Sequence, residues 1–463
     1  MSHAANHSPT PPQSNRMPGQ IRFIVGSEAC ERFSFYGMRS ILMVFMMGHL
    51  HMAEKDATSV YHLFVAGCYF MPLLGGWLSD RFLGKYHTIL YISLCYCAGH
   101  GVLALGESKT GLFIGLTLLA IGSGGIKPCV SSFVGDQFNQ STSHLIKRAY
   151  NYFYWAINFG SFFSTMLIPV LLKKYGASVA FGIPGVLMAL ATIVFWLGRK
   201  HYVRVPPTRQ TGTAGYLPVL FYAVTHQSER RPGQTFFDVA RAKFKPVEVE
   251  GAKAVSGVFI VFATVSVFWA LFDQHGSTWV VQASQMEPTF LRWKLEASQI
   301  QALNPAMVMV LIPLFAFVVY PLVEKLGLRL TPLRKMSAGM VLTGLSFVAA
   351  AVVQAQLDRG VSVNIGWQFL QYLILTSAEV MISVTGLEFA YTQAPRAMKS
   401  TLMSFWLLMV FAGNSFTALI AKLNQFQGAN QFLFFAVLMF AVSGIFIYTA
   451  ARYRERNYVE NEP

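Results

Sequence analysis

The chain has 463 residues, of which 54% are hydrophobic and only 12% are charged, and its mean hydropathy is +0.45. This composition excludes an ordinary soluble domain and predicts an all-α polytopic membrane protein embedded in a lipid bilayer. The net charge of +15 does not indicate nucleic acid as a partner, because most of the 36 Lys and Arg residues are predicted to lie on one side of the membrane, the side that holds the N-terminus, as the positive-inside rule describes.

Apolar windows of about 20 residues, the length that crosses a bilayer as a helix, recur along the chain. Their centres lie near residues 38, 68, 96, 120, 160, 188, 265, 311, 344, 376, 410 and 440, which predicts 12 transmembrane helices. An even number places both termini on one side, and the positive charge makes that side the cytoplasm. Residues 1–20 lack the apolar core of a signal peptide, so we expect a disordered cytoplasmic tail there.

The first predicted span carries a polar stripe. Glu28, Arg32, Tyr36 and Arg39 recur at intervals of three and four residues and therefore share one helix face, with Glu31 one step to the side. An ion inside hydrocarbon costs about 3 kcal/mol on insertion scales, so such side chains face a partner or a water-filled path. The stripe indicates an interior cavity that handles protons and a charged solute.

A long polar stretch at residues 201–253 divides the spans into two six-helix halves, at 21–200 and 254–452, and residues 453–463 form a second cytoplasmic tail. The stretch is basic, and we expect a cytoplasmic linker. It contains a semi-apolar piece, Tyr216 to Val224, which is too short to cross a bilayer and is predicted to form an amphipathic surface helix.

The segment after the second span reads Gly75-Gly-Trp-Leu-Ser-Asp-Arg81 and resembles the loop motif of the major facilitator superfamily. We take Gly76, Asp80 and Arg81 as candidate gating residues. A capped helix end with a basic loop is the alternative, and it explains the charges but not the paired glycines. All five cysteines fall within predicted spans, so we expect neither a disulfide framework nor a metal site, and no cofactor.

Five longer blocks, between about Glu28 and Trp406, resemble the proton-coupled oligopeptide transporter family of the major facilitator superfamily. They are Glu28-Ala-Cys-Glu-Arg32, the run from Gly122 to Phe138, Phe153 to Gly160, Phe268 to Ser277, and Glu379 to Phe389. The resemblance implies the major facilitator fold, with the substrate between the halves near the midplane. It also implies import of di- and tripeptides by a monomer that alternates its access and is driven by a proton gradient.

A peptide is a zwitterion with variable side chains, so its carrier must bind both charged ends. Arg39 offers a planar fork suited to a carboxylate, and Lys127 adds a second positive charge; both resemble the family's carboxylate-binding pair. Glu379, one turn before Ser383, resembles the acid that takes the peptide amino group. The resemblance adds further candidate substrate contacts, namely Tyr36, Tyr69, Asn158, Ser383, Trp269, Asn304 and Trp406. From position alone, the two asparagines could equally bridge helices and the tryptophans could be packing.

Proton coupling requires groups whose protonation changes their partners. Glu28 and Glu31 are two acids competing for Arg32, so a proton on one can break one bond and free another. By resemblance, Asp273 pairs with Arg39 and Lys127 pairs with Glu379. His62 resembles a histidine of animal members and is a candidate accessory proton site; a packing or interfacial histidine is the alternative.

The chain also departs from the family pattern. Members commonly have tyrosine where this chain has Phe35, so one hydroxyl near the carboxylate site is missing. The linker has no room for the two extra helices of many bacterial members, and the short link at residues 354–362 excludes the large external domain of animal members. This combination favours a compact bacterial form in the inner membrane.

Three other functions compete with peptide transport. A related branch of the family carries nitrate or other anions but tends to lose the first-helix signature and the paired Lys and Glu. A non-transporting peptide sensor would not need the intact acids of the first helix. An intramembrane enzyme is disfavoured because the sequence lacks the metal, aspartyl and serine motifs of that class.

Overall fold

The computed structural model describes residues 16–207, 215–393 and 398–453. Over these ranges the chain is almost entirely helical, which confirms the predicted all-α class. The strands of the described residues are two short ones, β1 (Thr289–Phe290) and β2 (Trp293–Lys294), and they pair antiparallel. A helix satisfies its own backbone hydrogen bonds, which is why apolar sequence of this length adopts it in a bilayer.

Ten helical segments in the described ranges are long and apolar enough to cross a membrane. One of them, Glu54–Leu105, is 52 residues long and contains two of the predicted spans. The first helix, Ile21–Val44, has 24 residues but stands outside the ten because it carries the charged stripe. Dividing the long segment and adding the first helix gives a set of spans consistent with the 12 predicted.

Contacts between backbones divide the chain into two compact units. The first unit is Met1–Arg39 with Met71–Arg209, and the second is Ser40–Phe70 with Gln210–Pro463. Both α1 and α2 therefore contribute residues to each unit. The last boundary between the units, after Arg209, lies in the linker. The helices as far as the linker are α1 (Ile21–Val44), α2 (Glu54–Leu78), α3 (Gly84–Leu105), α4 (Lys109–Asp136), α5 (Ile146–Tyr175) and α6 (Ala177–Leu197).

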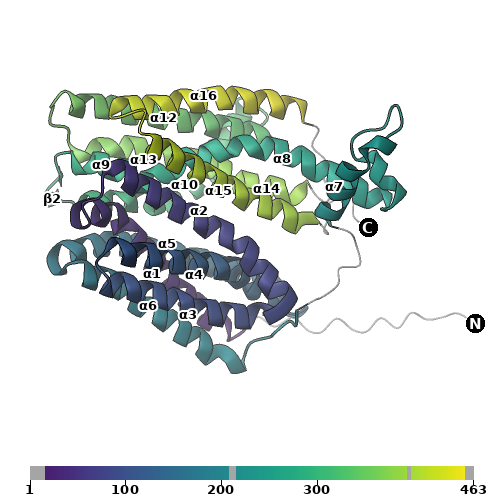
Figure 1. Ribbon diagram of the computed structural model, residues 1–463, viewed down its shortest axis with the longest axis horizontal. Helices are drawn as coiled ribbons and strands as arrows, with labels where there is room; N and C mark the ends of the chain where they lie inside the picture. The colour runs from purple at the N-terminus through teal and green to yellow at the C-terminus, as the bar shows by residue number, and fades with distance from the viewer. Residues whose placement is uncertain (1–15, 208–214, 394–397, 454–463) are drawn as a thin grey trace, which may run out of the picture. The chain divides into compact units, whose positions relative to one another are not determined.

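The remaining helices belong to the second unit. They are α7 (Tyr216–Thr225), α8 (Pro246–Phe272), α9 (Thr278–Ser284), α10 (Leu303–Leu314), α11 (Tyr320–Lys325), α12 (Pro332–Asp358), α13 (Gln368–Glu379), α14 (Thr385–Thr392), α15 (Lys399–Leu423) and α16 (Ala429–Arg452). In this unit α8, α12 and α16 run side by side (Figure 1). Two π-helical segments, Phe315–Val319 and Val380–Val384, join α10 to α11 and α13 to α14.

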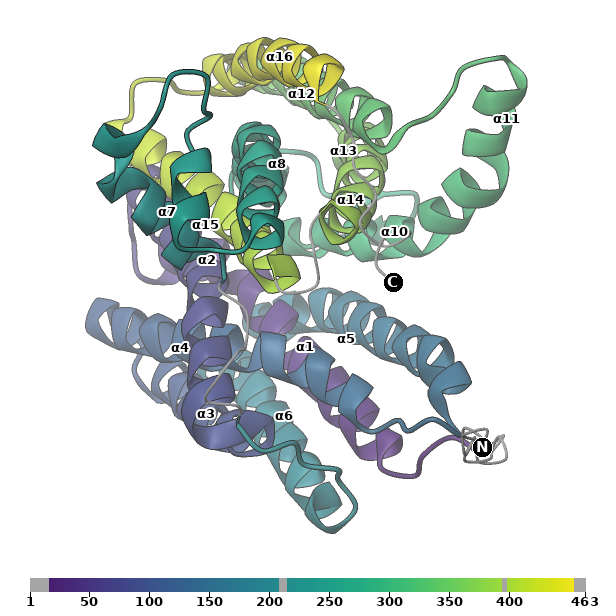
Figure 2. The ribbon, with the colours of Figure 1, turned by 90° about the vertical axis from the view of Figure 1, so that its right-hand side faces the viewer.

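Close helix packing in the first unit depends on glycine. Helix α3 lies between α4 and α6 (Figure 2). A Cβ atom added to Gly75 on α2 would stand 2.2 Å from the carbonyl oxygen of Gly125 on α4, and one added to Gly160 on α5 would stand 2.7 Å from the carbonyl oxygen of Ala29 on α1. The absent side chains let the backbones approach each other, which is the usual role of small residues between membrane helices.

Side-chain contacts join the segment Ser40–Phe70 to the rest of the second unit. The side-chain amide of Gln301 donates a hydrogen bond of 3.0 Å to the carbonyl oxygen of Ser40, and the rings of Phe70 and Phe411 lie 5.3 Å apart. Tyr61 is fully buried. The end of α1 and the start of α2 therefore belong structurally to the C-terminal bundle.

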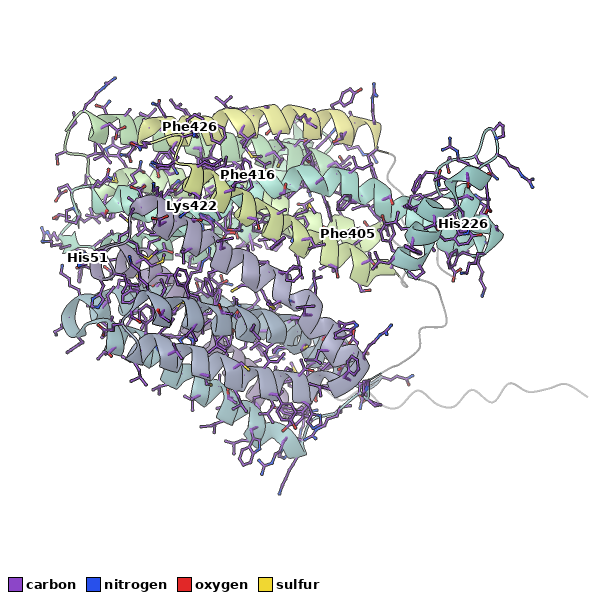
Figure 3. The ribbon with its side chains drawn as sticks, viewed as in Figure 1. His51, His226, Phe405, Phe416, Lys422 and Phe426 are labelled. Carbon is purple, nitrogen blue, oxygen red and sulfur yellow. The ribbon has the colours of Figure 1, made fainter. Side chains whose placement is uncertain are left out.

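The linker contains the helix α7, over almost the same residues as the predicted surface helix. The Tyr216 hydroxyl lies 3.0 Å from the Ser256 hydroxyl of α8, which fixes α7 to that helix. Asp238 forms ion pairs with Arg241 at 3.0 Å and with Lys253 at 2.8 Å. The hydrogen bonds from Lys253 and from Thr235 hold the pKa of Asp238 well below its usual range. Figure 3 labels His226 at the end of α7.

The segment after α2, which was predicted as a loop, is instead a π-helical turn at Ser79–Leu83 that leads directly into α3. Gly84, the first residue of α3, has φ +72°, a conformation that favours glycine because it has no Cβ atom. The polar residues of the motif therefore lie on a helical turn.

Candidate functional site

The charged stripe of α1 is a buried ion cluster. The Nε atom of Arg32 lies 2.9 Å from Oε1 of Glu28, and Arg32 also pairs with Glu31. All three residues are at most 5% exposed. Two carboxylates thus share one guanidinium, as the sequence predicts, and the charge of Lys127 on α4 also acts on Glu28.

The close approach of α5 supports this cluster, because a Cβ atom on Gly160 would stand 3.2 Å from the Cβ atom of Arg32. A larger residue at position 160 would push the helix that carries the cluster away. Buried charges remain stable only when they are paired and held in good geometry, and this packing holds the guanidinium between its two acids.

The rest of the stripe, Tyr36 and Arg39, lies further along α1. Arg39 is buried, with 7% of its surface exposed, and Tyr36 is half-buried. The ring of Phe35 meets the ring of Tyr36 edge-on at 5.4 Å, and the guanidinium of Arg32 lies over the Phe35 ring at 5.9 Å. Phe35 therefore packs against the ion cluster through an apolar ring.

Asn158, on α5, is buried, and its amide donates a hydrogen bond of 2.9 Å to the carbonyl oxygen of Tyr154 on the same helix. This is the one hydrogen bond of the Asn158 side chain found within the described ranges. The amide nitrogen therefore does not bridge two helices there, although the helix-bridging alternative was open from the sequence. Lys127 is half-buried on α4, one residue before Pro128.

In the second unit, Glu379 is the last residue of α13 and is held by an asparagine. The amide of Asn304 on α10 donates a hydrogen bond of 2.7 Å to Oε2 of Glu379 and a longer one of 3.3 Å to the Thr376 hydroxyl. Ser383 lies in the π-helical segment that follows Glu379, and its hydroxyl makes no hydrogen bond with any described residue. The sequence predicts Asn304 and Glu379 separately, and the structure brings them together.

Trp269 and Trp406 form an aromatic pair. Their rings are perpendicular with centroids 6.0 Å apart, and the indole nitrogen of Trp269 has no hydrogen-bond partner in the described part of the chain. A Cβ atom on Gly386 would come within 2.4 Å of Trp406, so this glycine makes room for the ring. Tyr69 is partly buried against the same core. Phe268 is fully buried and serves packing.

His62 lies in a buried chain of hydrogen bonds. Its Nδ1 atom is 2.8 Å from Oδ1 of Asn414, and the Asn414 amide nitrogen donates to Oδ2 of Asp273 at 2.8 Å. On its other side, Nε2 is 2.8 Å from the Ser277 hydroxyl. All four residues are at most 2% exposed, so the interfacial alternative for His62 does not apply.

The geometry of Asn414 fixes the position of a hydrogen. Its amide nitrogen is used by Asp273 and by the Val410 carbonyl oxygen at 3.0 Å, so its carbonyl oxygen faces His62. A carbonyl oxygen only accepts, and Nδ1 of His62 must therefore be the donor. Protonation of Nε2 would make His62 positively charged. The Asn414 amide would then lie between this cation and the Asp273 carboxylate and hydrogen-bond to both.

Sequence reasoning missed Asn414 and assigned no role to Ser277. Asn414 is a single amide inside the apolar span of α15, which is the same signal that singled out Asn158 and Asn304. In the first unit it also missed Ser34 and His100, whose side chains lie 2.7 Å apart in a buried position. A histidine in an apolar run is a signal that could have identified this pair.

The residues of the loop motif separate into two groups. A Cβ atom on Gly75 would collide with Gly125, whereas Gly76 has open space around it. Asp80 and Arg81 are exposed. The neighbouring Lys85 forms a bidentate contact with Asp136 at 2.8 and 2.6 Å, which joins the start of α3 to the end of α4. Over the described ranges, no three His, Cys, Asp or Glu residues are placed to hold a metal ion.

Ionisable side chains buried inside apolar helical spans are costly and mark candidate functional positions. The POT family model matches residues 86–432. The chain belongs to the POT family.

The relatives agree with this assignment. The chain is 40% identical over 403 residues to human solute carrier family 15 member 2, and the aligned region covers 82% of this chain and 55% of that protein. It spans little more than half the length of the curated relatives that it matches.

Solved structures cover nearly the whole chain. The crystal structure of the POT family transporter PepTSo has 42% identity and a TM-score of 0.89 over 96% of this chain and 99% of that one. An auto-inhibited POT family peptide transporter has 41% identity and the same TM-score and coverage. These likenesses confirm the predicted transporter fold.

Proposed function

We propose that this chain is a proton-coupled symporter that imports di- and tripeptides by alternating access. The observation that carries the proposal is the buried cluster of Glu28, Glu31 and Arg32 in a chain of the POT family. Two acids on one guanidinium can accept a proton by giving up one ion pair. A relative with 41% identity is described as a peptide transporter, which supports the substrate class.

We place the peptide carboxylate on Arg39 and Lys127 and the peptide amino group on Glu379. A guanidinium binds a carboxylate through two parallel hydrogen bonds. The Glu379 carboxylate already accepts one hydrogen bond, from Asn304, and an ammonium group can take its remaining acceptor sites. Tyr36, Tyr69, Asn158, Ser383 and the Trp269–Trp406 pair are the proposed contacts to the peptide backbone and side chains.

Coupling requires that protons and peptide compete for the same partners. We propose that Asp273 pairs with Arg39, and Lys127 with Glu379, in one state of the empty carrier, and that peptide binding or protonation releases these pairs. The chain from His62 through Asn414 to Asp273 supports a role for His62 as an accessory proton site. Gly76, Asp80 and Arg81 would serve the gate on the linker side.

For the cellular setting, we propose a bacterial inner membrane with both termini in the cytoplasm. The positive charge of the linker favours that orientation. The functional unit would be a monomer that is driven by the proton gradient without a cofactor.

Uptake of labelled dialanine into proteoliposomes, with and without an inward proton gradient, tests the proposal. Accumulation that needs the gradient and is inhibited by unlabelled dipeptides supports it. Uptake of nitrate in place of peptide would identify an anion carrier. Peptide binding without any uptake or exchange would identify a sensor.

A further inference from the structure

At one end of the second unit, the side chains enclose a polar cavity of about 470 Å³. The starts of α2 and α16 and the ends of α9, α12 and α15 meet there. Asp56 on α2 pairs with Lys422 on α15 at 2.7 Å, and the backbone N–H of Ala429 donates to Asp358 on α12 at 2.9 Å. These contacts hold together the helix ends that surround the cavity.

Several polar groups in this cavity have unused hydrogen-bonding capacity. Glu54 and Lys55, adjacent at the start of α2, line the cavity, and neither charge has an ion-pair partner within the described ranges. Thr58, one turn further along, is only 2% exposed, and its hydroxyl likewise has no hydrogen-bond partner there. The side chains of Asn424 and Gln431 also line the cavity. An acid, a base, a buried hydroxyl and amides together fit a zwitterionic group.

An apolar hollow of about 870 Å³ adjoins the polar cavity along α16. The two share Asn424, Phe426 and Gln427 as lining residues. Phe426, labelled in Figure 3, stacks on Phe434 of α16 with ring centroids 4.4 Å apart, so an aromatic pair stands at the junction. Beyond this pair the hollow continues along α16 to Ala441, and the lining residue Val437 is 66% exposed.

The depth of the apolar hollow matches one leaflet of a bilayer. With a rise of 1.5 Å per residue, Leu433 to Ala441 lie roughly 6 to 18 Å from the start of α16 at Ala429. Half of a hydrocarbon core of about 30 Å is about 15 Å. A molecule whose polar end fills the cavity would therefore lay its tail beside α16 at the depth of lipid acyl chains.

We propose that the two hollows together form a binding site for an aminophospholipid of the phosphatidylethanolamine type. The lipid ammonium donates hydrogen bonds to the Glu54 carboxylate, the phosphate accepts from Lys55 and the Thr58 hydroxyl, and one acyl chain lies along α16 against Val437. Phosphatidylglycerol has no cation for Glu54, so the site favours the ethanolamine headgroup. A soluble zwitterion has no tail that could occupy the apolar hollow.

The test is native mass spectrometry of the full chain released from nanodiscs with equal amounts of phosphatidylethanolamine and phosphatidylglycerol. We expect the protein to retain the ethanolamine lipid preferentially, by on the order of tenfold, because a charge-assisted hydrogen bond distinguishes the headgroups. Glu54→Gln should retain lipid without this preference. Equal retention of both lipids by the unmodified protein would overturn the proposal.

A pair of matched variants tests the apolar hollow. Val437→Trp fills it and should abolish specific lipid retention, whereas Val186→Trp on α6, also at a position that is 66% exposed, should not. Equal behaviour of the two variants would contradict the site. Free phosphoethanolamine should leave the melting temperature of the protein unchanged. If it stabilises the protein as much as the lipid does, the cavity binds a small polar solute and the lipid proposal is wrong.

Discussion

Asn304 donates a hydrogen bond of 2.7 Å to the carboxylate of Glu379, across 75 positions in the sequence. The amide supplies a hydrogen-bond donor but no positive charge. A π-helical segment, Val380–Val384, follows Glu379 directly, and such segments are frequent at functional sites. An acid held in this way is suited to exchange partners.

Replacement of this acid tests the proposed orientation of the peptide. We expect Glu379→Gln to lose affinity for peptides with a free amino end much more than for N-acetylated ones, by about 2 kcal/mol, the size of a charge-assisted hydrogen bond. Calorimetry with both kinds of peptide measures the difference. Glu388→Gln, at an exposed position on α14, is the control. Equal losses for free and acetylated peptides would make Glu379 a structural acid.

The other end of the peptide is tested by Arg39. Because lysine keeps the charge but loses the planar fork, Arg39→Lys should impair dipeptide uptake by on the order of tenfold. Peptides with an amidated carboxyl end should bind poorly to the unmodified protein. Arg148→Lys, at an exposed position on α5, should not change uptake. Equal binding of amidated and free peptides would contradict the carboxylate assignment.

The ion cluster of α1 predicts a separation of coupling from exchange. Glu31→Gln leaves Arg32 paired with Glu28 but removes the competing acid, so proton-driven accumulation should be abolished while peptide exchange continues at least in part. Proteoliposome uptake with a proton gradient, and counterflow without one, measure the two activities. Glu229→Gln in the linker is the control. Undiminished accumulation by the Glu31 variant would remove this cluster from the coupling mechanism.

The link between His62 and Asp273 predicts a role for Asn414, a residue that the sequence did not single out. Asn414→Leu breaks both hydrogen bonds and should reduce gradient-driven accumulation at least as strongly as His62→Gln. Thr417→Val, one turn away, serves as the control. It breaks a buried hydrogen bond of 2.9 Å to the Ala270 carbonyl oxygen, which is not one of the hydrogen bonds that link His62 to Asp273. If Asn414→Leu and Thr417→Val lose stability and accumulation equally, Asn414 contributes only to packing.

The paired glycines of the loop motif should differ in their sensitivity to substitution. Gly75→Ala would place a methyl group 2.2 Å from the Gly125 carbonyl oxygen, and the overpacking should destabilise the protein by about 1 to 3 kcal/mol. Gly76→Ala meets open space and should not destabilise it. Melting temperatures in detergent compare the two variants. A loss of transport in Gly76→Ala at unchanged stability would support a gating role for that position.

The sequence by itself determined the class of the protein and its helices. Composition and apolar windows are local properties, and a segment of about 20 apolar residues in a bilayer must form a helix to satisfy its backbone. The stripe from Glu28 to Arg39 could also be predicted, because the spacing of residues along one helix decides which of them share a face. The pairing of Glu28 and Glu31 with Arg32 follows from that spacing and is confirmed.

Only the tertiary structure decided which distant residues meet. His62 and Asn414 are 352 positions apart, and no periodicity relates them. Likewise, the need for glycine at Gly75 but not at Gly76 depends on the approach of α4. The grouping of Ser40–Phe70 with the C-terminal half follows from contacts such as that of Gln301 with Ser40. Such pairings depend on how whole helices pack, and helix packing is set by the sum of many side-chain contacts that a local pattern does not contain.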